Sequence, residues 1–267
     1  MNTNVYSEQL GVAIQAATKA GEVLVAEFGK KHLANFKTTH DIGLEVDKSS
    51  EKVILGIISS NYPSHNIYSE EIGAIDQQSD YTWFIDPLDG TNNFYAGIGY
   101  FGVSIALMRG NEIVVGVVNN PITKQLYFAE KGYGATLNGE PISPSNMQSL
   151  DKAVLAFIRG HRTYGGRLEQ GADAIEAHLT PQFRRTLKMW APALDWCLLA
   201  SGGIDALVSF ESEVEDQYAG TLIAQEAGAA VFGFDGEPYS SRVTRIFATN
   251  PFLKDSMIEM LRQENAK

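Results

Sequence analysis

The stretch that decides the fold is Trp-Phe-Ile-Asp-Pro-Leu-Asp-Gly-Thr-Asn-Asn-Phe, which occupies residues 83–94. The aromatic and β-branched residues that lead into it, 81–85, predict a buried strand. Pro87 has no backbone N–H and a fixed φ, so we expect the strand to stop at Asp86. Asp86 and Asp89 are then expected to lie together on a tight turn at the carboxyl end of this strand.

Gly90 and Thr91 follow this turn and are expected to open a helical turn whose free N–H groups can bind an anion. Two carboxylates beside such an anion site repel each other unless cations neutralise them. The combination favours metal-assisted phosphoryl chemistry. Hard oxygen ligands, with no histidine or cysteine among them, favour Mg²⁺ over Zn²⁺ or Cu²⁺, and Mn²⁺ is expected to substitute.

The chain has 267 residues, enough to bury a large core as one large domain or two closely packed ones. Apolar residues make up 44% of it and charged residues 20%, which is ordinary for a soluble globular protein. The net charge of -11 favours solubility and fits carboxylates that face bound cations. It argues against nucleic acid as a main partner, because a phosphate backbone requires a basic face.

Targeting and redox features predict a cytoplasmic protein. Residues 1–10 are polar and lack a basic-then-apolar pattern, so we expect no secretion signal. No apolar run approaches the roughly 20 residues needed to span a bilayer, so no membrane partner is expected. The single cysteine, Cys197, allows no internal disulfide and lies in an apolar helical pattern, which predicts a buried thiol in a reducing compartment.

Hydrophobic periodicity changes near residue 150. Helices are expected at 5–28 and 47–60, packed against a large antiparallel sheet built from strands at 66–69 and between 81 and 139. We therefore expect an N-terminal subdomain, 1–150, with this sheet and most metal ligands, and a C-terminal α/β subdomain, 151–267, with substrate-contacting elements. In the second subdomain, strands are expected at 154–158, 206–210, near 231 and at 246–249, and helices at 166–177, 193–201, 216–227 and 252–262.

Further acidic segments accompany the opening motif, and each has an ordinary explanation. Glu70 and Glu71 follow a short strand and could be a solvated surface pair. Asp47 stands near the start of the second helix, where a carboxylate interacts with the helix dipole by about 0.5–1 kcal/mol. Asp216 could be the N-cap of a helix.

The Asp-Pro-Leu-Asp-Gly-Thr motif at 86–91 resembles the central motif of the inositol monophosphatase family, the magnesium-dependent, lithium-sensitive phosphatases. Asp216, with Ala-Gly at +3 and +4 and Glu-Ala-Gly at +10 to +12, is similar to the family's third metal-binding segment. The resemblance implies an α/β fold of the α+β type: a layered α/β/α/β/α sandwich of the inositol monophosphatase and fructose-1,6-bisphosphatase kind. It spans residues 5–262, with anchors at 37–65, 70–71, 83–94, 131–139, 197–206 and 216–228.

The same resemblance implies a ligand set for two or three Mg²⁺ ions. Glu70, Asp86 and the backbone carbonyl of Leu88 would hold the first ion. Asp86 would bridge to a second ion, which Asp89 and Asp216 would also bind. A third, weaker ion would rest on Glu70 and water.

Catalysis, again by resemblance, would depend on Asp47, Glu70 and Thr91. Asp47 and Thr91 would orient a metal-bound water and help to remove its proton. Gly90, Thr91 and Asp216 would contact the substrate, with the N–H groups of the first two on phosphate oxygens. Water would attack in line, without a covalent phosphoenzyme.

Departures from the family pattern cluster around the substrate. Ser209 stands where inositol phosphatases place a glutamate for a sugar hydroxyl, and Trp190-Ala191-Pro192-Ala193 replaces the usual Gly-(Ser/Thr)-Ala-Ala. Glu215 replaces a tryptophan, and Leu44 replaces a threonine. Because Ala191 and Ser209 remove much of the expected inositol recognition, myo-inositol 1-phosphate is not a secure substrate.

The segment 159–167 carries Arg159, Arg162 and Arg167 and is either a solvated turn or a lid arm that reaches a second phosphate or a carboxylate on the substrate. Arg184, Arg185 and Lys188 could add to such an arm. We expect a phosphomonoesterase that acts on a small phosphorylated metabolite, a sugar or polyol phosphate first. Fructose-1,6-bisphosphatase, histidinol-phosphatase and 3'-nucleotidase specificities are the alternatives.

A second class of function is also consistent with the altered substrate positions. The chain could be a regulatory family member whose surface binds a partner, as some bacterial relatives do with transcription machinery. The complete set of carboxylates argues against lost chemistry. A Ca²⁺-binding structural protein is a poor explanation, because the acidic residues are scattered and no EF-hand loop is present. The resemblance further implies a homodimer.

Overall fold

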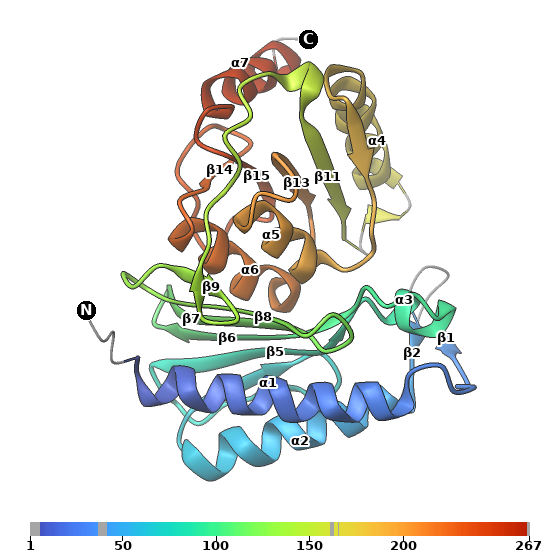
Figure 1. Cartoon of the computed structure of the whole chain (residues 1–267), viewed down its shortest axis with the longest axis vertical. Helices are drawn as coiled ribbons and strands as arrows, with labels where there is room; N and C mark the ends of the chain where they lie inside the picture. Colours follow the sequence, from blue (N-terminus) through green and yellow to red (C-terminus); the bar gives the residue numbers. More distant parts are fainter. Residues whose placement is uncertain (1–5, 37–41, 161–162, 165, 266–267) are drawn as a thin grey trace.

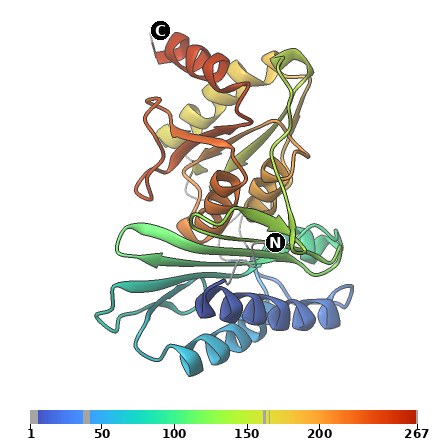
Figure 2. The same cartoon turned by 60° about the vertical axis from the view of Figure 1, so that its left-hand side comes forward.

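The computed structural model describes residues 6–36, 42–160, 163–164 and 166–265. Within this part of the chain, the layers follow one another as helices, sheet, helices, sheet and helices (Figure 1). Figure 2 shows the same layers from a second side. The predicted α/β/α/β/α sandwich is confirmed.

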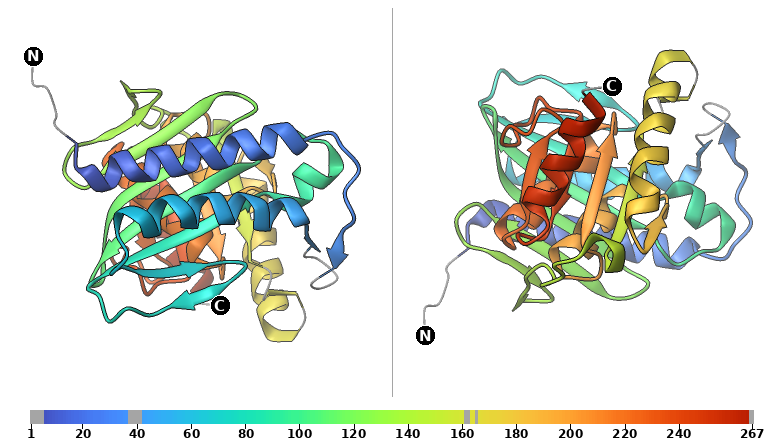
Figure 3. Two further views of the ribbon diagram at one scale, coloured as in Figure 1. Left: turned by 90° about the horizontal axis from the view of Figure 1, so that it is seen from below. Right: turned by 90° about the horizontal axis from the view of Figure 1, so that it is seen from above.

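The outer layer at one end consists of α1, Glu8–Glu27, and α2, Glu45–Asn61, which run side by side across the larger sheet (Figure 3). Ser7 caps α1, because its hydroxyl accepts a hydrogen bond from the N–H of Leu10 at 3.2 Å. Alanines at helical spacing let α1 approach the sheet closely, so that Asn119 Nδ2 donates directly to the carbonyl of Ala17 at 3.0 Å. The buried residues of α1 are Leu10, Ala13, Ala16, Ala17, Ala20, Gly21 and Leu24.

The larger sheet has the strand order β10-β9-β8-β7-β6-β5-β3-β4 among the described residues. Its strands pair antiparallel except for β3 and β5, which pair in parallel and depart locally from the expected antiparallel sheet. Because of this parallel pair, the carboxyl ends of β3 and β5 meet at one edge. The strands are β3 Asn66–Ser69, β4 Gly73–Ile75, β5 Tyr81–Asp89, β6 Gly102–Arg109, β7 Glu112–Asn120, β8 Gln125–Glu130, β9 Ala135–Leu137 and β10 Glu140–Pro141; β1 Asn35–Phe36 and β2 Ile42–Gly43 form a separate pair.

Strand β5 does not stop at Asp86, as Pro87 led us to expect, but continues to Asp89. Its pairing with β6 is regular up to Asp86, where Ser104 is the partner, and then shifts before Asp89 meets Gly102. A proline is tolerated at such a bulge, because the missing N–H falls where the ladder is already interrupted. The bulge holds both aspartates on the strand itself and not on a loop beyond it.

The smaller sheet has the order β12-β11-β13-β15-β14 among the described residues, and the strands β12, β11 and β13 are parallel. Helices α5 and α6 fill the layer between the two sheets, and α4 and α7 lie on the outer face (Figures 1 and 3). The predicted strands and helices of this half are confirmed to within a few residues, and the structure adds β12, which the sequence analysis did not predict. The elements are β11 Val154–Arg159, α4 Gly166–Leu179, β12 Arg185–Leu187, α5 Pro192–Ala200, β13 Ala206–Phe210, α6 Val214–Glu226, β14 Ala230–Gly233, β15 Arg245–Thr249 and α7 Lys254–Asn265, with short 3₁₀ turns at Leu150–Lys152 and Thr180–Gln182.

Glycines set the depth at which α6 lies between α5 and the larger sheet. A Cβ at Gly116 in β7 would lie 2.7 Å from the carbonyl oxygen of Ala219 in α6. A Cβ at Gly220 would lie 2.4 Å from the Cβ of Trp196 in α5. The backbone of β7 therefore packs directly against the backbone of α6, and α6 packs directly against the base of the Trp196 side chain. Larger residues at these glycines would push α6 away from the sheet or from α5.

A buried polar network ties the two halves together where the chain crosses between them. Asp205 accepts from Ser145 Oγ at 2.5 Å and from the backbone N–H of Val154 at 2.8 Å. Asn250 Nδ2 donates to Ser145 Oγ at 2.9 Å. The network anchors the connection from β10 to the smaller sheet. The division of the chain into 1–150 and 151–267 stays a prediction.

The imidazole of His65 lies in a stack of rings at the edge of the larger sheet. It stacks between Tyr62 and Tyr81, with ring centroids at 4.7 and 4.8 Å. Its Nδ1 lies 3.1 Å from Trp83 Nε1, which can only donate, so Nδ1 accepts and the ring is neutral. Burial lowers the pKa of His65.

We predict that this histidine makes the fold sensitive to acid. A lowered pKa in the folded state means that stability is present above the unfolded pKa of about 6.5 and is lost as pH falls through it. The free energy of unfolding of the wild type should therefore approach that of His65→Phe between pH 7 and pH 5, as measured by urea titrations with chelator present. Parallel pH curves for the two proteins would contradict this assignment.

Candidate metal centre

Carboxylates from both halves of the chain converge where β5 ends. Asp86 and Asp89 belong to β5, and Asp216 lies in the first turn of α6. One carboxylate oxygen from each of these residues lies within 4.8 Å of those from the other two. Asp86 and Asp89 are 3% and 1% exposed, so like charges gather here largely out of water. Such a group is costly unless cations or protons neutralise it.

The backbone orients the two aspartates of β5. The N–H of Leu88 donates to Asp86 Oδ1 at 2.9 Å, which folds the Asp-Pro-Leu segment into an Asx turn. The N–H of Leu194, at the start of α5, donates to Asp89 Oδ2 at 3.4 Å. The other oxygen, Asp89 Oδ1, is buried and has no hydrogen-bond partner among the described residues. An unused buried acceptor is what a metal ligand requires.

Burial raises the pKa of Asp86, Asp89 and Asp216 well above that of an ordinary aspartate. Negative neighbours add to this effect, chiefly Glu70 for Asp86 and Asp89 for Asp216. The backbone N–H groups of α5 act in the opposite direction on Asp89. All donors are hard oxygens, and one of them is unsatisfied, so the residues fit a divalent cation of the Mg²⁺ or Mn²⁺ kind.

Glu70 comes directly after β3, next to the end of β5. Ser69 and Ile85 are parallel partners, and the N–H of Glu70 donates to the carbonyl of Ile85 at 3.2 Å. The glutamate is exposed and does not belong to the cluster of three, although its charge acts on Asp86. The parallel pairing of β3 with β5 is therefore what brings the Glu-Glu segment to the predicted site.

Asp47 is buried in the first turn of α2, where Asp47 Oδ2 accepts from the N–H of Leu44 at 2.7 Å. The ordinary role of a helix-start carboxylate is thus present. Ser50 lies on the same helix face, and its Oγ donates to the carbonyl of Pro87 at 2.8 Å. This bond fixes the start of α2, which carries Asp47, beside the Asp-Pro-Leu turn. Sequence analysis missed Ser50, because a serine in a polar helix carries little signal.

Gly90 and Thr91 start α3, Thr91–Ala96, directly after the aspartates. Gly90 has φ of 87°, and a Cβ there would lie 3.1–3.2 Å from the side chain of Ala191 and the carbonyls of Trp190 and Tyr100. Only glycine fits this left-handed and crowded position. Thr91 Oγ1 donates to the carbonyl of Leu88 at 3.0 Å. The predicted helical turn after Asp89 is confirmed.

The start of α5 is the part of the site that sequence analysis missed. Besides the N–H of Leu194 on Asp89, it contributes Asp195, a carboxylate that is 2% exposed. Tyr100 Oη donates to Asp195 Oδ1 at 2.8 Å. Burial raises the pKa of Asp195 to about 7, and the hydrogen bond from Tyr100 opposes this rise. An aspartate inside the apolar run Ala193–Cys197 was the available signal.

The positions that depart from the family pattern differ in their burial. Ala191 is fully buried, and Ser209 is fully buried with an Oγ that has no hydrogen-bond partner among the described residues. Glu215 is 7% exposed, and its carbonyl accepts from Ser104 Oγ at 3.1 Å. Trp190 is 62% exposed and has φ of 57°, a left-handed conformation that is strained for a bulky residue.

The first arginine of the basic segment 159–167 does not extend freely into solvent. Arg159 donates to Asp173 at 2.8 Å, to the carbonyl of Glu169 at 3.1 Å and to Thr163 Oγ1 at 3.1 Å, so its guanidinium is held against α4. Its guanidinium also lies over the ring of Tyr164 at 5.1 Å. Arg162 lies outside the described residues, and the lid hypothesis for the rest of this segment stays a prediction.

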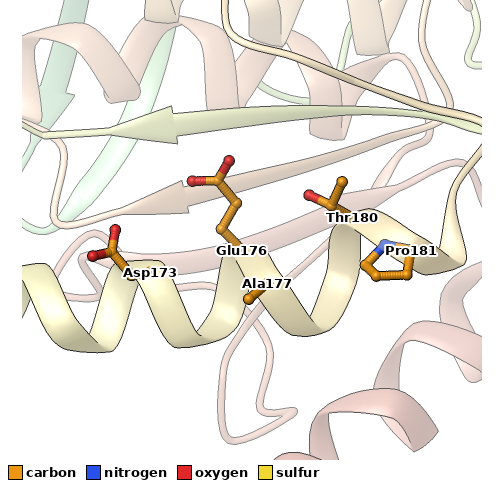
Figure 4. Close-up of a pocket in the computed structure, with 5 residues that line it drawn as sticks. All are labelled: Asp173, Glu176, Ala177, Thr180 and Pro181. Atoms are coloured by element: carbon orange, nitrogen blue, oxygen red, sulfur yellow. The ribbon is translucent and has the colours of Figure 1, made fainter.

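A shallow groove of ≈ 360 Å³ lies along α4, well separated in sequence from the carboxylate cluster (Figure 4). Asp173 is held by Arg159, and Glu176 pairs with Lys188 at 2.5 Å. These two acidic residues are therefore neutralised by the very cations proposed for the lid arm. The groove is lined by Asp173, Glu176, Ala177, Thr180 and Pro181.

Comparison with known proteins assigns the family. The family model described as "Inositol monophosphatase family" matches residues 6–266. The chain belongs to the inositol monophosphatase family. The members of this family are metal-dependent phosphatases. The acidic cluster of Asp86, Asp89 and Asp216 could bind a metal ion, as such a family requires. No helix in the described part of the chain is long and apolar enough to cross a bilayer.

Relatives span almost the whole chain. An inositol monophosphatase from Mesembryanthemum crystallinum is 35% identical over 96% of this chain and 97% of its own length. A fructose-1,6-bisphosphatase/inositol-1-monophosphatase from Aquifex aeolicus is 36% identical over 95% of each chain. The Nus factor SuhB from Pasteurella multocida is 36% identical over 85% of each. Among solved structures, the extragenic suppressor protein suhB from Bartonella henselae matches with a TM-score of 0.88 and 30% identity over 96% of this chain and 99% of its own.

We predict that the carboxylate cluster destabilises the metal-free fold. Because the pKa values of the cluster are raised, the folded state keeps protons that the unfolded state releases, so metal-free stability should fall as pH rises above about 4. Asp89→Asn removes one buried charge and keeps an oxygen for the N–H of Leu194. In chelator it should raise the melting temperature at pH 8 and have little effect at pH 5, by about 2–4 °C for each kcal/mol relieved.

Saturating Mg²⁺ should reverse this order, because the wild type gains from the cation and Asp89→Asn loses a ligand. Asp255→Asn is the matched control, since it removes an exposed carboxylate at the start of α7. A melting temperature of Asp89→Asn that stays below the wild type in chelator at pH 8 would rule out the repulsion.

Proposed function

We propose that this protein is a Mg²⁺-dependent phosphomonoesterase that hydrolyses a small phosphorylated metabolite with a metal-activated water. The convergence of the buried Asp86 and Asp89 with the partly buried Asp216 supports this proposal most directly, and the family membership supports it independently. Two or three ions are proposed, and Mn²⁺ is expected to substitute for Mg²⁺. A cytoplasmic location and a homodimer remain predictions.

The proposed ligands come from the larger sheet and from helix α6 of the middle layer. Asp86 and Asp89 on β5 and Asp216 on α6 form the converging group, and Glu70 with the carbonyl of Leu88 would complete it from the edge of the larger sheet. When bound, the ions would supply Lewis-acid activation of the attacking water and of the departing oxygen.

The chain itself would position the reacting groups. Asp47, whose helix is fixed beside the Asp-Pro-Leu turn through Ser50, would orient the attacking water together with Thr91 and help to remove its proton. The N–H groups of Gly90 and Thr91 would hold phosphate oxygens at the start of α3. Asp216 would face the leaving oxygen. Water attacks in line, so no side chain has to act as a nucleophile.

The substrate proposal is a sugar or polyol phosphate. Ser209 and Ala191 offer no carboxylate for a sugar hydroxyl, which argues for a leaving group other than myo-inositol. Fructose 1,6-bisphosphate, histidinol phosphate and nucleotide 3'-phosphates stay as alternatives. A relative is named as a fructose-1,6-bisphosphatase/inositol-1-monophosphatase, which supports testing a bisphosphate beside the monoesters.

Phosphate release tests the proposal directly. The panel is inositol 1-phosphate, fructose 1,6-bisphosphate, histidinol phosphate, 2-glycerophosphate and 3'-phosphoadenosine 5'-phosphate, each with Mg²⁺ and with chelator. We expect Mg²⁺-dependent release that Asp216→Asn lowers by about 100-fold or more, since a ligand charge is lost while the shape is kept. Full turnover by Asp216→Asn at ordinary Mg²⁺ would sink the assignment of this residue.

The names of several relatives as Nus factor SuhB favour one further candidate, a regulatory role through a partner. In that case a pull-down from cell extract should retain one specific protein equally on the wild type and on Asp216→Asn. Specific retention together with silence of the wild type across the phosphate panel would favour this candidate. Robust Mg²⁺-dependent turnover without a retained partner would favour the phosphatase.

A further inference from the structure

Tyr100 and Asp195 have no role in the proposed chemistry, but a buried hydrogen bond between them joins two segments that meet at the metal centre. Tyr100 lies between α3 and β6, and Asp195 lies in the first turn of α5, 95 positions later in the chain. Tyr100 Oη donates to Asp195 Oδ1 at 2.8 Å, and Asp195 is 2% exposed. A buried carboxylate with a neutral partner is a costly arrangement, and an apolar pair of similar volume would be cheaper to bury.

The same two segments are clamped together on their other side. Asn93 Nδ2 donates to the carbonyl of Tyr100 and to the carbonyl of Met189, each at 2.7 Å. Between these segments lies Gly90, whose missing side chain leaves room for the carbonyls of Tyr100 and Trp190. The segment that leads into α5 and the first turn of α5 are therefore held against α3 and the segment after it by two contacts, those of Asn93 and the Tyr100–Asp195 bond.

These two contacts, of Asn93 and of Tyr100 with Asp195, position the N–H group of Leu194, which binds the proposed ligand Asp89. Leu194, directly before Asp195, donates to Asp89 Oδ2 at 3.4 Å. This contact uses one oxygen of Asp89 and leaves the buried Oδ1 without a hydrogen-bond partner in the described part of the chain. A shift of the first turn of α5 would release Asp89 Oδ2 and let the carboxylate rotate away from the other ligands.

We propose that Tyr100 and Asp195 are positioning residues for the metal centre. Their hydrogen bond holds the first turn of α5 so that the N–H of Leu194 fixes the rotamer of Asp89 and directs Oδ1 to the cation. This inference rests on the proposed metal-dependent function. The opposing view is that the bond only stabilises the fold.

Metal affinity separates the two views. Mg²⁺ or Mn²⁺ binding to the whole protein is measured at pH 8 by calorimetry, beside the Mg²⁺ dependence of phosphate release. Tyr100→Phe should weaken metal binding by about 10-fold or more, the effect typical of losing a group that orients a ligand. Turnover at saturating Mg²⁺ should fall less than the affinity does.

The matched control is Tyr127→Phe. Tyr127 is also a buried tyrosine, 2% exposed, and its hydroxyl interacts with Ser201 at the opposite end of α5. It should cost stability without weakening metal binding. Equal metal affinities for Tyr100→Phe, Tyr127→Phe and the wild type would overturn the proposal.

Two further variants keep the test decisive if Tyr100→Phe folds poorly. Asp195→Asn keeps an oxygen acceptor for Tyr100 and should bind metal almost as well as the wild type, whereas an affinity as weak as that of Asp195→Ala would overturn the hydrogen-bond role. The double variant Tyr100→Phe with Asp195→Leu restores an apolar core at this point. We expect its melting temperature to recover while metal affinity stays weak, and recovery of both would show a purely structural role.

The wild type distinguishes the two levels of failure. If it binds no divalent cation and releases no phosphate, the proposed function fails and this inference with it. If it binds and turns over normally while the Tyr100 and Asp195 variants bind as tightly, only the positioning role fails.

Discussion

Mutual repulsion of carboxylates that are held out of water is the constraint around which this structure is arranged. Asp86 and Asp89 come from the larger sheet and Asp216 comes from α6 in the middle helical layer, and bringing their carboxylate oxygens within 4.8 Å of one another opposes folding. The favourable side is supplied by the sandwich: two sheets, with α5 and α6 between them, bury enough apolar surface to force the charges together. The carboxylate cluster thus lowers the free energy of unfolding of the metal-free protein, and binding of a cation would raise it again.

Much of this could be predicted from the sequence, because the relevant signals are local. Apolar spacing predicts α1 and α2, and the Asp-Pro-Leu-Asp-Gly-Thr run predicts two ligands and the turn into α3. Asp216 needed a resemblance, since a carboxylate at a helix start is equally well explained by capping. The 3-residue strand β12 was missed, because it is short and contains few strand-favouring residues.

Contacts between distant residues could not be predicted. Nothing in the sequence pairs Tyr100 with Asp195 or places the N–H of Leu194 on Asp89, since these contacts depend on how the two sheets are set across the middle layer. Pro87 misled the prediction in the opposite sense: its chemistry is incompatible with a regular ladder, but a bulge accommodates it inside β5. Arg159 is a further example. Its charge suggested a contact with the substrate, but the guanidinium forms an ion pair with Asp173 instead.

The glycine contacts of α6 have a consequence for how such a protein can change over generations. Asp216 belongs to the helix whose Ala219 carbonyl would meet any side chain placed at Gly116, and whose Gly220 fits against Trp196. Substitutions at these two glycines cannot move this helix by small steps, because the backbone of Ala219 and the base of the Trp196 side chain leave no room for a Cβ. The position of Asp216 relative to β5 is therefore tied to these two glycines. The side chain of Trp190 is exposed, so evolution can replace it without disturbing that packing.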